Sequence, residues 1–213
     1  MRRRVLVSGE LPYVEIGGIK WATMNIGAET ETDYGLYFQC GDTQGYTEEQ
    51  CGSGDYQKPF VWADYKFGNG TASPTATKMV KYNSSDAKTT LELSDDAARL
   101  YLGGNWRLPT YNELTKLTRG GTYKWESNYN NSGIAGVTVT SKTDSSKKIF
   151  LPASGYLYNG SATDKGSNIY VVSSSIDTNR LKVKNIAYSA VEITTGATKQ
   201  RNYGFTLRPI LDE

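Results

Sequence analysis

The sequence NWRLPTYNE at residues 105–113 contains the strongest structural signal in the chain. Thr110 and Glu113 have the spacing of a capping box, in which each side chain binds the backbone N–H of the other residue in the first turn of a helix. Leu114 and Leu117 follow on one face of that helix and form an apolar stripe. Two consecutive glycines further on are typical of a helix end. We therefore expect a helix that begins after Thr110 and stops at these glycines.

Two side chains of this run, and one near the C-terminus, are expected to be structural. Trp106 comes directly before the capped helix, where a large ring is typically a buried plug. Arg107 beside it is expected to be its hydrogen-bonding partner in the same region. Arg208 precedes a proline in a terminal strand, and we expect it to be a buried or half-buried anchor.

Two hairpins are expected on either side of this region. Residues 13–16 and 19–22 alternate at the strand period around Gly17-Gly18, a pair that suits a primed two-residue turn. Residues 137–140 and 149–151 are rich in β-branched and aromatic side chains and flank a polar turn. Each pair of segments is predicted to form two antiparallel strands.

A second helix is expected after Ser94. This serine is the predicted N-cap, and Asp95 and Asp96 would be acids of the first turn, where they suit the helix dipole. A pair of acids can also bind a metal ion, but the helix start explains these two better. The helix continues into Ala97 and the residues after it.

Residues 41–88 are rich in Gly, Ser, Thr, Asn and Asp and have no sustained periodicity. They are expected to form long loops that carry aromatic side chains such as Phe60 and Trp62. Loops of this length are usually functional or structurally specialised. Few helices, many short strands and long loops indicate an α+β fold. No linker is visible, so we expect one domain at residues 13–213 after an N-terminal tail at residues 1–12.

The composition excludes several classes of function. The chain has no histidine, which removes Ser-His-Asp, Cys-His and His-zinc chemistry. The net charge of +2 is too small to indicate nucleic-acid binding. No apolar run approaches the ~20 residues of a membrane span, so no membrane insertion is expected, and no signal peptide is visible. No motif selects a catalytic pair of carboxylates. We predict that the chain is not an enzyme and uses no cofactor.

The loop between Cys40 and Cys51 leaves two alternatives open. These cysteines, the only two in the chain, form either a local disulfide in an oxidising compartment or two free thiols. Asp42, Glu48 and Asp55 offer oxygen ligands for calcium, but they lack the spacing of an EF-hand. We therefore predict no metal site.

Four stretches together resemble a known family. They are KWATMNIG at 20–27, GGNWRLPT at 103–110, LPASGY at 151–156 and YGFTLRPI at 203–210. In order and spacing they resemble the C-type-lectin-like Fibrobacter major paralogous domain, which is frequent in gut bacteria and their phages. That domain is similar to the variable proteins of diversity-generating retroelements. The resemblance extends from about residue 13 to residue 211.

The resemblance implies a C-type-lectin-like fold with short strands, two helices and long ordered loops. It also implies a display segment, here about residues 153–205, that presents variable side chains to a ligand. The serine triplet of that segment is at residues 173–175, whereas Val172 stands where the family usually has tryptophan. The more distant formylglycine-generating enzymes use cysteines near the C-terminus. This chain has none after Cys51, which argues against that activity.

The display segment supplies the candidate contact residues. They are Tyr156, Tyr158, Asn159, Tyr170, Lys182, Lys184, Tyr188, Lys199, Asn202 and Tyr203. Tyrosine faces stack on sugar rings or pack in protein hot spots, and lysine and asparagine donate directed hydrogen bonds. Six basic residues against one acid give the span 180–208 a net charge of +5, from Arg180, Lys182, Lys184, Lys199, Arg201 and Arg208 against Glu192.

This charge favours an anionic ligand, such as an acidic glycan or an acidic protein patch. The alternative is that these charges are solvated strand faces and loops. We expect a recognition domain for a surface protein or glycan, extracellular or on a virion, displayed on a phage tail or a bacterial surface. The competing hypothesis is a structural or assembly module, a homo-oligomer in which the same surface makes permanent subunit contacts.

Overall fold

The structure is a computed structural model, and it describes residues 11–55 and 57–213. Strands predominate, and two α-helices occur among the described residues, so the chain is an α+β protein. The helices are α1 (Ala97–Leu102) and α2 (Tyr111–Gly120). The strands are β1 (Tyr13–Ile16), β2 (Ile19–Ala22), β3 (Tyr37–Phe38), β4 (Trp106–Arg107), β5 (Gly121–Glu126), β6 (Gly136–Ser141), β7 (Lys148–Pro152), β8 (Tyr156–Tyr158), β9 (Ser161–Thr163), β10 (Asn168–Ile176), β11 (Lys182–Ser189), β12 (Ile193–Gln200), β13 (Phe205–Thr206) and β14 (Ile210–Leu211). Short 3-10 turns are η1 (Glu48–Gln50), η2 (Trp62–Asp64), η3 (Leu93–Asp95) and η4 (Tyr129–Asn131).

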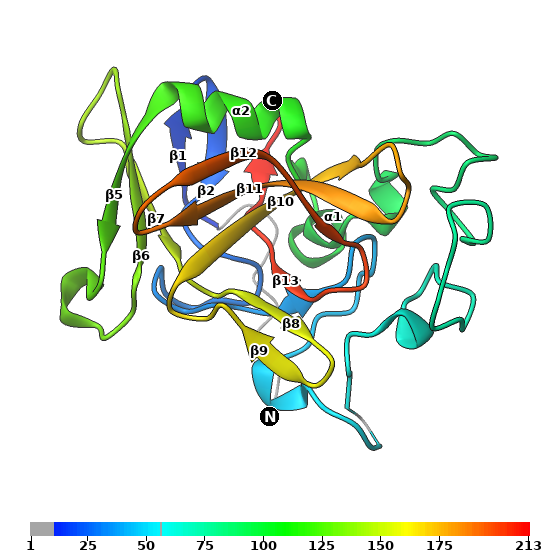
Figure 1. Cartoon of the computed structure of the whole chain (residues 1–213). Coiled ribbons are helices and arrows are strands. Elements are labelled where there is room, and N and C mark those ends of the chain that lie inside the picture. The colour runs from blue at the N-terminus through cyan, green and yellow to red at the C-terminus, as the bar shows by residue number, and fades with distance from the viewer. Residues whose placement is uncertain (1–10, 56) are drawn as a thin grey trace.

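One sheet joins the two ends of the described chain. Its strand order is β1-β2-β14-β4, and Ile210 of β14 pairs with Trp21 on one side and with Arg107 on the other (Figure 1). The predicted hairpin of β1 and β2 is confirmed, and both turn glycines have the positive φ that a primed turn requires, 63° at Gly17 and 72° at Gly18. The expected tail reaches too far. Leu11 is buried, so the packed region includes it, while residues 1–10 lie outside the described residues.

The helix α2 confirms the capping box. The Oγ1 of Thr110 accepts from the N–H of Glu113, and a carboxylate oxygen of Glu113 accepts from the N–H of Thr110 at 2.8 Å. Leu114 and Leu117 are buried, and the helix ends at Gly120. The sequence therefore predicted both ends of α2 and the face that it buries.

Trp106 and Arg107 are structural, as expected. Trp106 is 2% exposed and packs in a core with Leu102. Arg107 does not bind the tryptophan. Its guanidinium makes two hydrogen bonds to Glu113, at 2.6 and 2.8 Å, and one to Asp212 at 2.6 Å. Arg107 therefore fixes the start of α2 to the C-terminal strand.

The predicted start of α1 is wrong. Ser94 lies in the turn η3, and the N-cap is Asp96, whose carboxylate accepts from the N–H groups of Ala98 and Arg99. The extended backbone of Asp96, with φ −97° and ψ 110°, brings its carboxylate to these two N–H groups. Asp95, expected in the first turn of the helix, instead lies buried in the preceding 3-10 turn.

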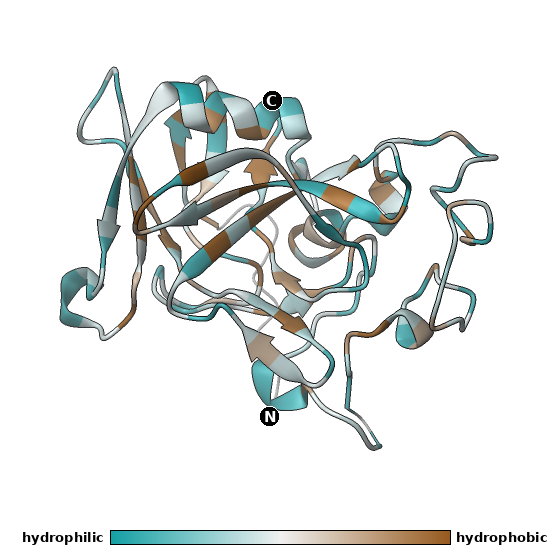
Figure 2. Ribbon diagram, viewed as in Figure 1, coloured by the Kyte–Doolittle hydropathy of each residue, from teal (hydrophilic) through white to brown (hydrophobic). Residues whose placement is uncertain are grey.

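The sheet β10-β11-β12 lies between two cores, because both faces of β10 and β11 are buried. Val171 and Ile186 pack in a core with the leucines of α2. Val172 and Val183 face the opposite way, into a core with residues of β3 and β13. In Figure 2 apolar segments occur on these central strands and on the elements packed against them, whereas the outer loops are largely polar. The other predicted hairpin is confirmed as β6 and β7, in the sheet β5-β6-β7.

The long polar segment from residue 41 to residue 88 is irregular, as expected. Its described residues contain only the short turns η1 and η2, and in Figure 1 this part of the chain winds along one side of the molecule. Phe60, Tyr65 and Phe67 are buried and Trp62 is half-buried, so its aromatic side chains anchor it. Both cysteines are free thiols, which is one of the two alternatives that the sequence left open.

Candidate ligand-recognition site

Five of the ten predicted contact residues lie in one cluster. They are Tyr156, Tyr158, Tyr170, Lys199 and Tyr203. The rings of Tyr156 and Tyr203 are stacked, with centroids 4.9 Å apart and planes 8° apart. The ring of Tyr158 lies 4.7 Å from that of Tyr203 at 47°. Tyr158 is 40% exposed and the other two are half-buried. We call Tyr156, Tyr158 and Tyr203 the tyrosine platform.

Strand β8 supplies two members of the platform, and its backbone is tightly held. Leu157 between them is fully buried, so the two tyrosines share the opposite face of the strand. The backbone of Leu157 exchanges two hydrogen bonds of 2.9 Å with Gly204. The β8–β9 turn has positive φ at Asn159 and Gly160, and the N–H of Gly160 donates to the carbonyl of Pro59. Asn159 is exposed at the tip of this turn.

The turn that carries Tyr203 is fixed by a ring of hydrogen bonds. Asn202, a predicted contact residue, is fully buried, and its side chain donates to the carbonyl of Phe60 at 3.0 Å. Gln39 donates to the carbonyl of Asn202 and to the carboxylate of Asp64, each at 2.8 Å. The N–H of Phe60 donates back to Asp64 at 3.0 Å. A Cβ on Gly204 would lie 2.4 Å from the ring of Phe60, so the turn also needs a glycine there.

A buried lysine stands among the acids that could have bound calcium. The Nζ of Lys58 donates to the carbonyl of Asp64 at 2.9 Å and lies 3.8 Å from a carboxylate oxygen of Asp42. Glu48 pairs with a lysine of the β9–β10 connection, and Asp55 is exposed. Within residues 11–55 and 57–213 no group of three or more His, Cys, Asp or Glu side chains could hold a metal ion.

Lys199 lies beside the platform, against the ring of Tyr156 and that of the buried Tyr170. Its Nζ is 4.6 Å from the ring centre of Tyr156 and 4.4 Å from that of Tyr170, within cation–π range. Burial lowers the pKa of Lys199, and the nearby carboxylate of Asp164 acts in the opposite direction. That carboxylate also accepts a hydrogen bond of 2.5 Å from the hydroxyl of Tyr170. Lys199 is therefore a partly desolvated ammonium group with aromatic and acidic neighbours.

Three of the predicted contact residues are corrected because their side chains are buried. Asn202 is 0% exposed, Tyr188 is 1% exposed and Tyr170 is 6% exposed. Tyr188 points into the core beneath α2 and packs 5.4 Å from Tyr123. Tyr170 lies under the platform, in edge contact with Tyr156. These residues support the site or the core and do not form its surface.

The three lysines among the predicted contact residues do not gather on one face. Lys199 pairs directly with Val183, so both side chains point to the same face of the sheet. Lys182 and Lys184, the neighbours of Val183, point to the opposite face, since side chains alternate along a strand. There the Nζ of Lys184 lies 5.6 Å from the ring centre of Tyr111, at the start of α2.

Two of the six basic residues counted in the sequence are buried. Arg208 is 3% exposed and donates to Asn25 and to two backbone carbonyls, which confirms it as an anchor. Arg201 is 0% exposed, and its guanidinium donates to the hydroxyl of Tyr65 and to three backbone carbonyls. The positive surface expected from the local charge count is therefore not formed as one patch.

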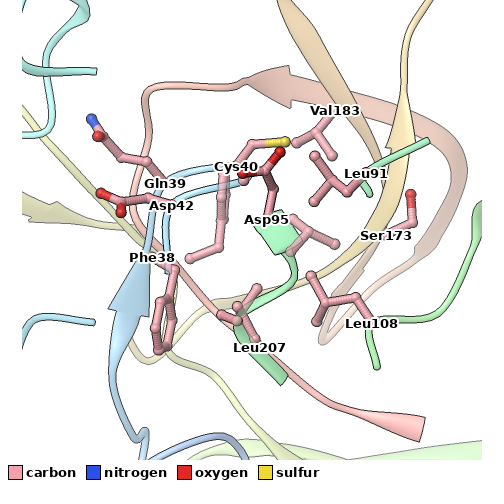
Figure 3. Close-up of a pocket in the computed structure, with 14 residues that line it drawn as sticks. Phe38, Gln39, Cys40, Asp42, Leu91, Asp95, Leu108, Ser173, Val183 and Leu207 are labelled. Atoms are coloured by element: carbon pink, nitrogen blue, oxygen red, sulfur yellow. The ribbon is translucent and has the colours of Figure 1, made fainter. Parts of the chain in front are cut away.

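A small cavity lies in the core between β3, η3 and the sheet β10-β11-β12 (Figure 3). Its labelled side chains include Cys40, Asp95 and Leu108. Burial raises the pKa of the Cys40 thiol to about 11, so the thiol remains protonated. The carboxylate of Asp95 is already bound by two lysines and by the hydroxyl of Tyr82. The carboxylate in this cavity is therefore engaged within the core.

No helix in the described part of the chain is both long and apolar enough to span a membrane. Comparisons of the chain with protein-family models, with curated proteins and with solved structures find no match. The resemblance seen in the sequence therefore remains a prediction.

Proposed function

We propose that this chain is a non-enzymatic recognition domain with a C-type-lectin-like fold, and that it binds its ligand at the tyrosine platform. The observation that carries the proposal is the platform itself, where three accessible tyrosines are held together on a backbone fixed by hydrogen bonds. Tyrosine offers a large amphipathic contact surface and loses little side-chain entropy on binding. A preformed platform avoids the ordering cost that a flexible loop would incur.

The arrangement of the chain supports the fold that the resemblance implies. The N-terminal hairpin and the C-terminal strand β14 share one sheet. Each of the four stretches has residues in structural positions. Trp21, Trp106, Ala153 and Arg208 are buried, and Gly204 is in a turn that admits no side chain. The platform is formed by Tyr156 of the third stretch and Tyr203 of the fourth, together with Tyr158.

The chemistry of the chain supports a binding role over catalysis. The sequence has no histidine. The half-buried and buried acids near the cores are engaged, since Glu113 binds Arg107 and Asp95 binds Lys66. The thiol of Cys40 is buried. The proposed partner is a surface protein or glycan, and the proposed location is extracellular, on a phage tail or on a bacterial surface.

The proposal is tested by binding of the fluorescently labelled protein to a panel of gut bacterial strains. We expect wild type to bind at least one strain, and the double variant Tyr158→Ser/Tyr203→Ser to bind about 100-fold more weakly, from about tenfold for each ring. Lys182→Ser/Lys184→Ser, on the other face of the sheet, should bind like wild type.

Tyr13→Ser is the matched control, because Tyr13 is 48% exposed on β1, which lies away from β8 in Figure 1. Thermal melting of each variant separates a loss of binding from a loss of folding. Absence of binding to every strain, or equal binding by the platform variant, would contradict the proposal.

A further inference from the structure

We infer that the platform binds a sugar ring of an uncharged glycan, an inference that rests on the proposed function and specifies its ligand. The described surface of the platform matches such a ring in three ways, namely the type of its exposed side chains, its charge and its polar surroundings. A pyranose ring has an apolar face of C–H bonds and an edge of hydroxyl groups. It therefore fits an aromatic surface that is surrounded by neutral hydrogen-bonding groups.

The first observation is that the platform is aromatic, without aliphatic side chains around it. Among the large apolar residues that are well exposed, Tyr158 alone belongs to the platform, and the aliphatic ones lie on other elements. Val80 is in the long loop, Leu93 in η3, Leu100 on α1 and Val191 in the β11–β12 turn, and Ile193 is at the start of β12, at the opposite end of that strand from Lys199. Two small cavities among the described residues are lined by other side chains, and of the cluster only the buried Tyr170 lines one of them. A partner protein would gain little from inserting an apolar side chain here.

The second observation is that the charges beside the platform are balanced. The ammonium of Lys199 lies against aromatic rings, and the carboxylate of Asp164 is close enough to influence its pKa. Lys165 pairs with Glu48 at 2.5 Å. Lys199 beside the platform therefore has an anionic neighbour in Asp164, and Lys165, the next residue in the chain, is neutralised by Glu48. Lys182 and Lys184 point away from it, so they add no charge on this side. A strongly acidic ligand would meet no excess of positive charge.

The third observation concerns neutral polar groups. Asn159 and Ser161 are exposed in the hairpin that carries Tyr158. Their amide and hydroxyl groups can both donate and accept hydrogen bonds, as the hydroxyl groups of a sugar do. The hydrogen bond from Gly160 to Pro59 holds the turn backbone. Ser161 pairs directly with Tyr158 across the hairpin, so these two side chains share one face.

The test uses cells of a strain that the wild-type protein binds. One sample is oxidised with sodium periodate, which cleaves the vicinal diols of sugars, and another is digested with proteinase K. We expect periodate to reduce binding about tenfold or more, whatever the protease does. Binding should change less than about twofold between roughly 0.05 and 0.5 M NaCl, because an uncharged ligand forms no ion pair that salt could screen. Polysaccharide extracted from the same strain should compete with the cells.

Variants of one residue separate ring stacking from other contributions. Tyr158→Phe keeps the ring and should retain binding within about threefold, whereas Tyr158→Ser should lose about tenfold. Tyr13→Ser should leave binding unchanged. Binding that survives periodate but is lost after proteinase K would identify a protein ligand and overturn this inference, while leaving the proposed function in place. A steep loss of binding with salt would also overturn it. If the protein binds no strain, the proposed function and the sugar inference fail together.

Discussion

Replacing Arg201 by methionine should destabilise the protein by about 3 kcal/mol. This arginine is fully buried directly before the turn that carries Tyr203. Its Nε donates to the hydroxyl of Tyr65 at 2.9 Å, and its two terminal nitrogens donate to the carbonyls of Lys81, Tyr82 and Arg180 at 2.8 to 3.2 Å. It therefore connects the long polar loop to the end of the display segment.

The expected magnitude follows from the acceptors that the substitution leaves unpaired. The hydroxyl of Tyr65 and the carbonyl of Tyr82 are in buried hydrogen bonds, and each such loss costs about 1–3 kcal/mol. The other two acceptors are partly buried and can reach water at a smaller cost. Removing the guanidinium also removes the cost of burying its charge, which offsets part of the loss. Methionine has a similar length and still packs on the surrounding rings.

Urea denaturation followed by circular dichroism measures this difference. In a chain of this size, about 3 kcal/mol corresponds to a melting temperature lower by roughly 6–12 °C. Arg180→Met is the matched control, since the guanidinium of Arg180 makes an exposed hydrogen bond to Lys88, and the change should be below about 0.5 kcal/mol. A loss below about 1 kcal/mol for Arg201→Met would show that Arg201 does not hold the loop in the way described.

Three further predictions concern the region around α2. Trp106→Ala should cost about 3 kcal/mol, because the ring is buried, and melting like wild type would refute its role as a plug. Thr110→Ala should cost about 1 kcal/mol by removing the N-cap, and an unchanged urea midpoint would contradict this. Burial alone would raise the pKa of Glu113, but hydrogen bonds from Arg107 and Thr110 lower it from 4.5 to about 2. The stability that this carboxylate contributes is therefore present above its unfolded-state pKa and is lost as the pH falls through about 2. Between pH 4.5 and about 2, the urea midpoint should fall less steeply with decreasing pH for Glu113→Gln than for wild type. Parallel curves for the two proteins would contradict a stabilising role of the Glu113 carboxylate.

The sequence was sufficient where the structural signal is local. The glycine pair between β1 and β2 and the capping box of α2 each depend on residues a few positions apart, and the structure confirms both. The start of α1 shows the limit of such signals. Ser94 and Asp96 are both good N-caps, and the choice between them depends on the 3-10 turn that comes before the helix.

The faces of the display segment could be predicted only in part. Lys182 and Lys184 share a face because of their spacing, and the sequence shows this. The position of Lys199 depends on the pairing of β12 with β11, which contains a register shift that the sequence does not reveal. The burial of Tyr170 could have been predicted from the sequence. This residue lies in an almost continuous apolar run from residue 169 to 172, a pattern typical of a strand buried on both faces.

The support of the platform could not be predicted from the sequence. Gln39, Lys58 and Asp64 meet the turn at Asn202 across long sequence separations, and nothing in their local sequence marks them as partners. The burial of Arg201 could not be predicted for the same reason, because its acceptors Lys81 and Tyr82 lie in the irregular loop, far away in the sequence. A count of basic residues included it as a surface charge, and only the tertiary structure shows that it is buried.

The most direct test of the account is protection of Tyr158 from nitration when the protein is bound to cells. Tetranitromethane modifies accessible tyrosines, and mass spectrometry of peptides reports the modification of each one. Tyr158 and Tyr13 are similarly accessible in the free protein, 40% and 48% exposed, so both should be nitrated. On bound protein, nitration of Tyr158 should fall about tenfold while that of Tyr13 remains unchanged. Equal nitration of Tyr158 in free and bound protein would contradict the claim that the platform is the binding site.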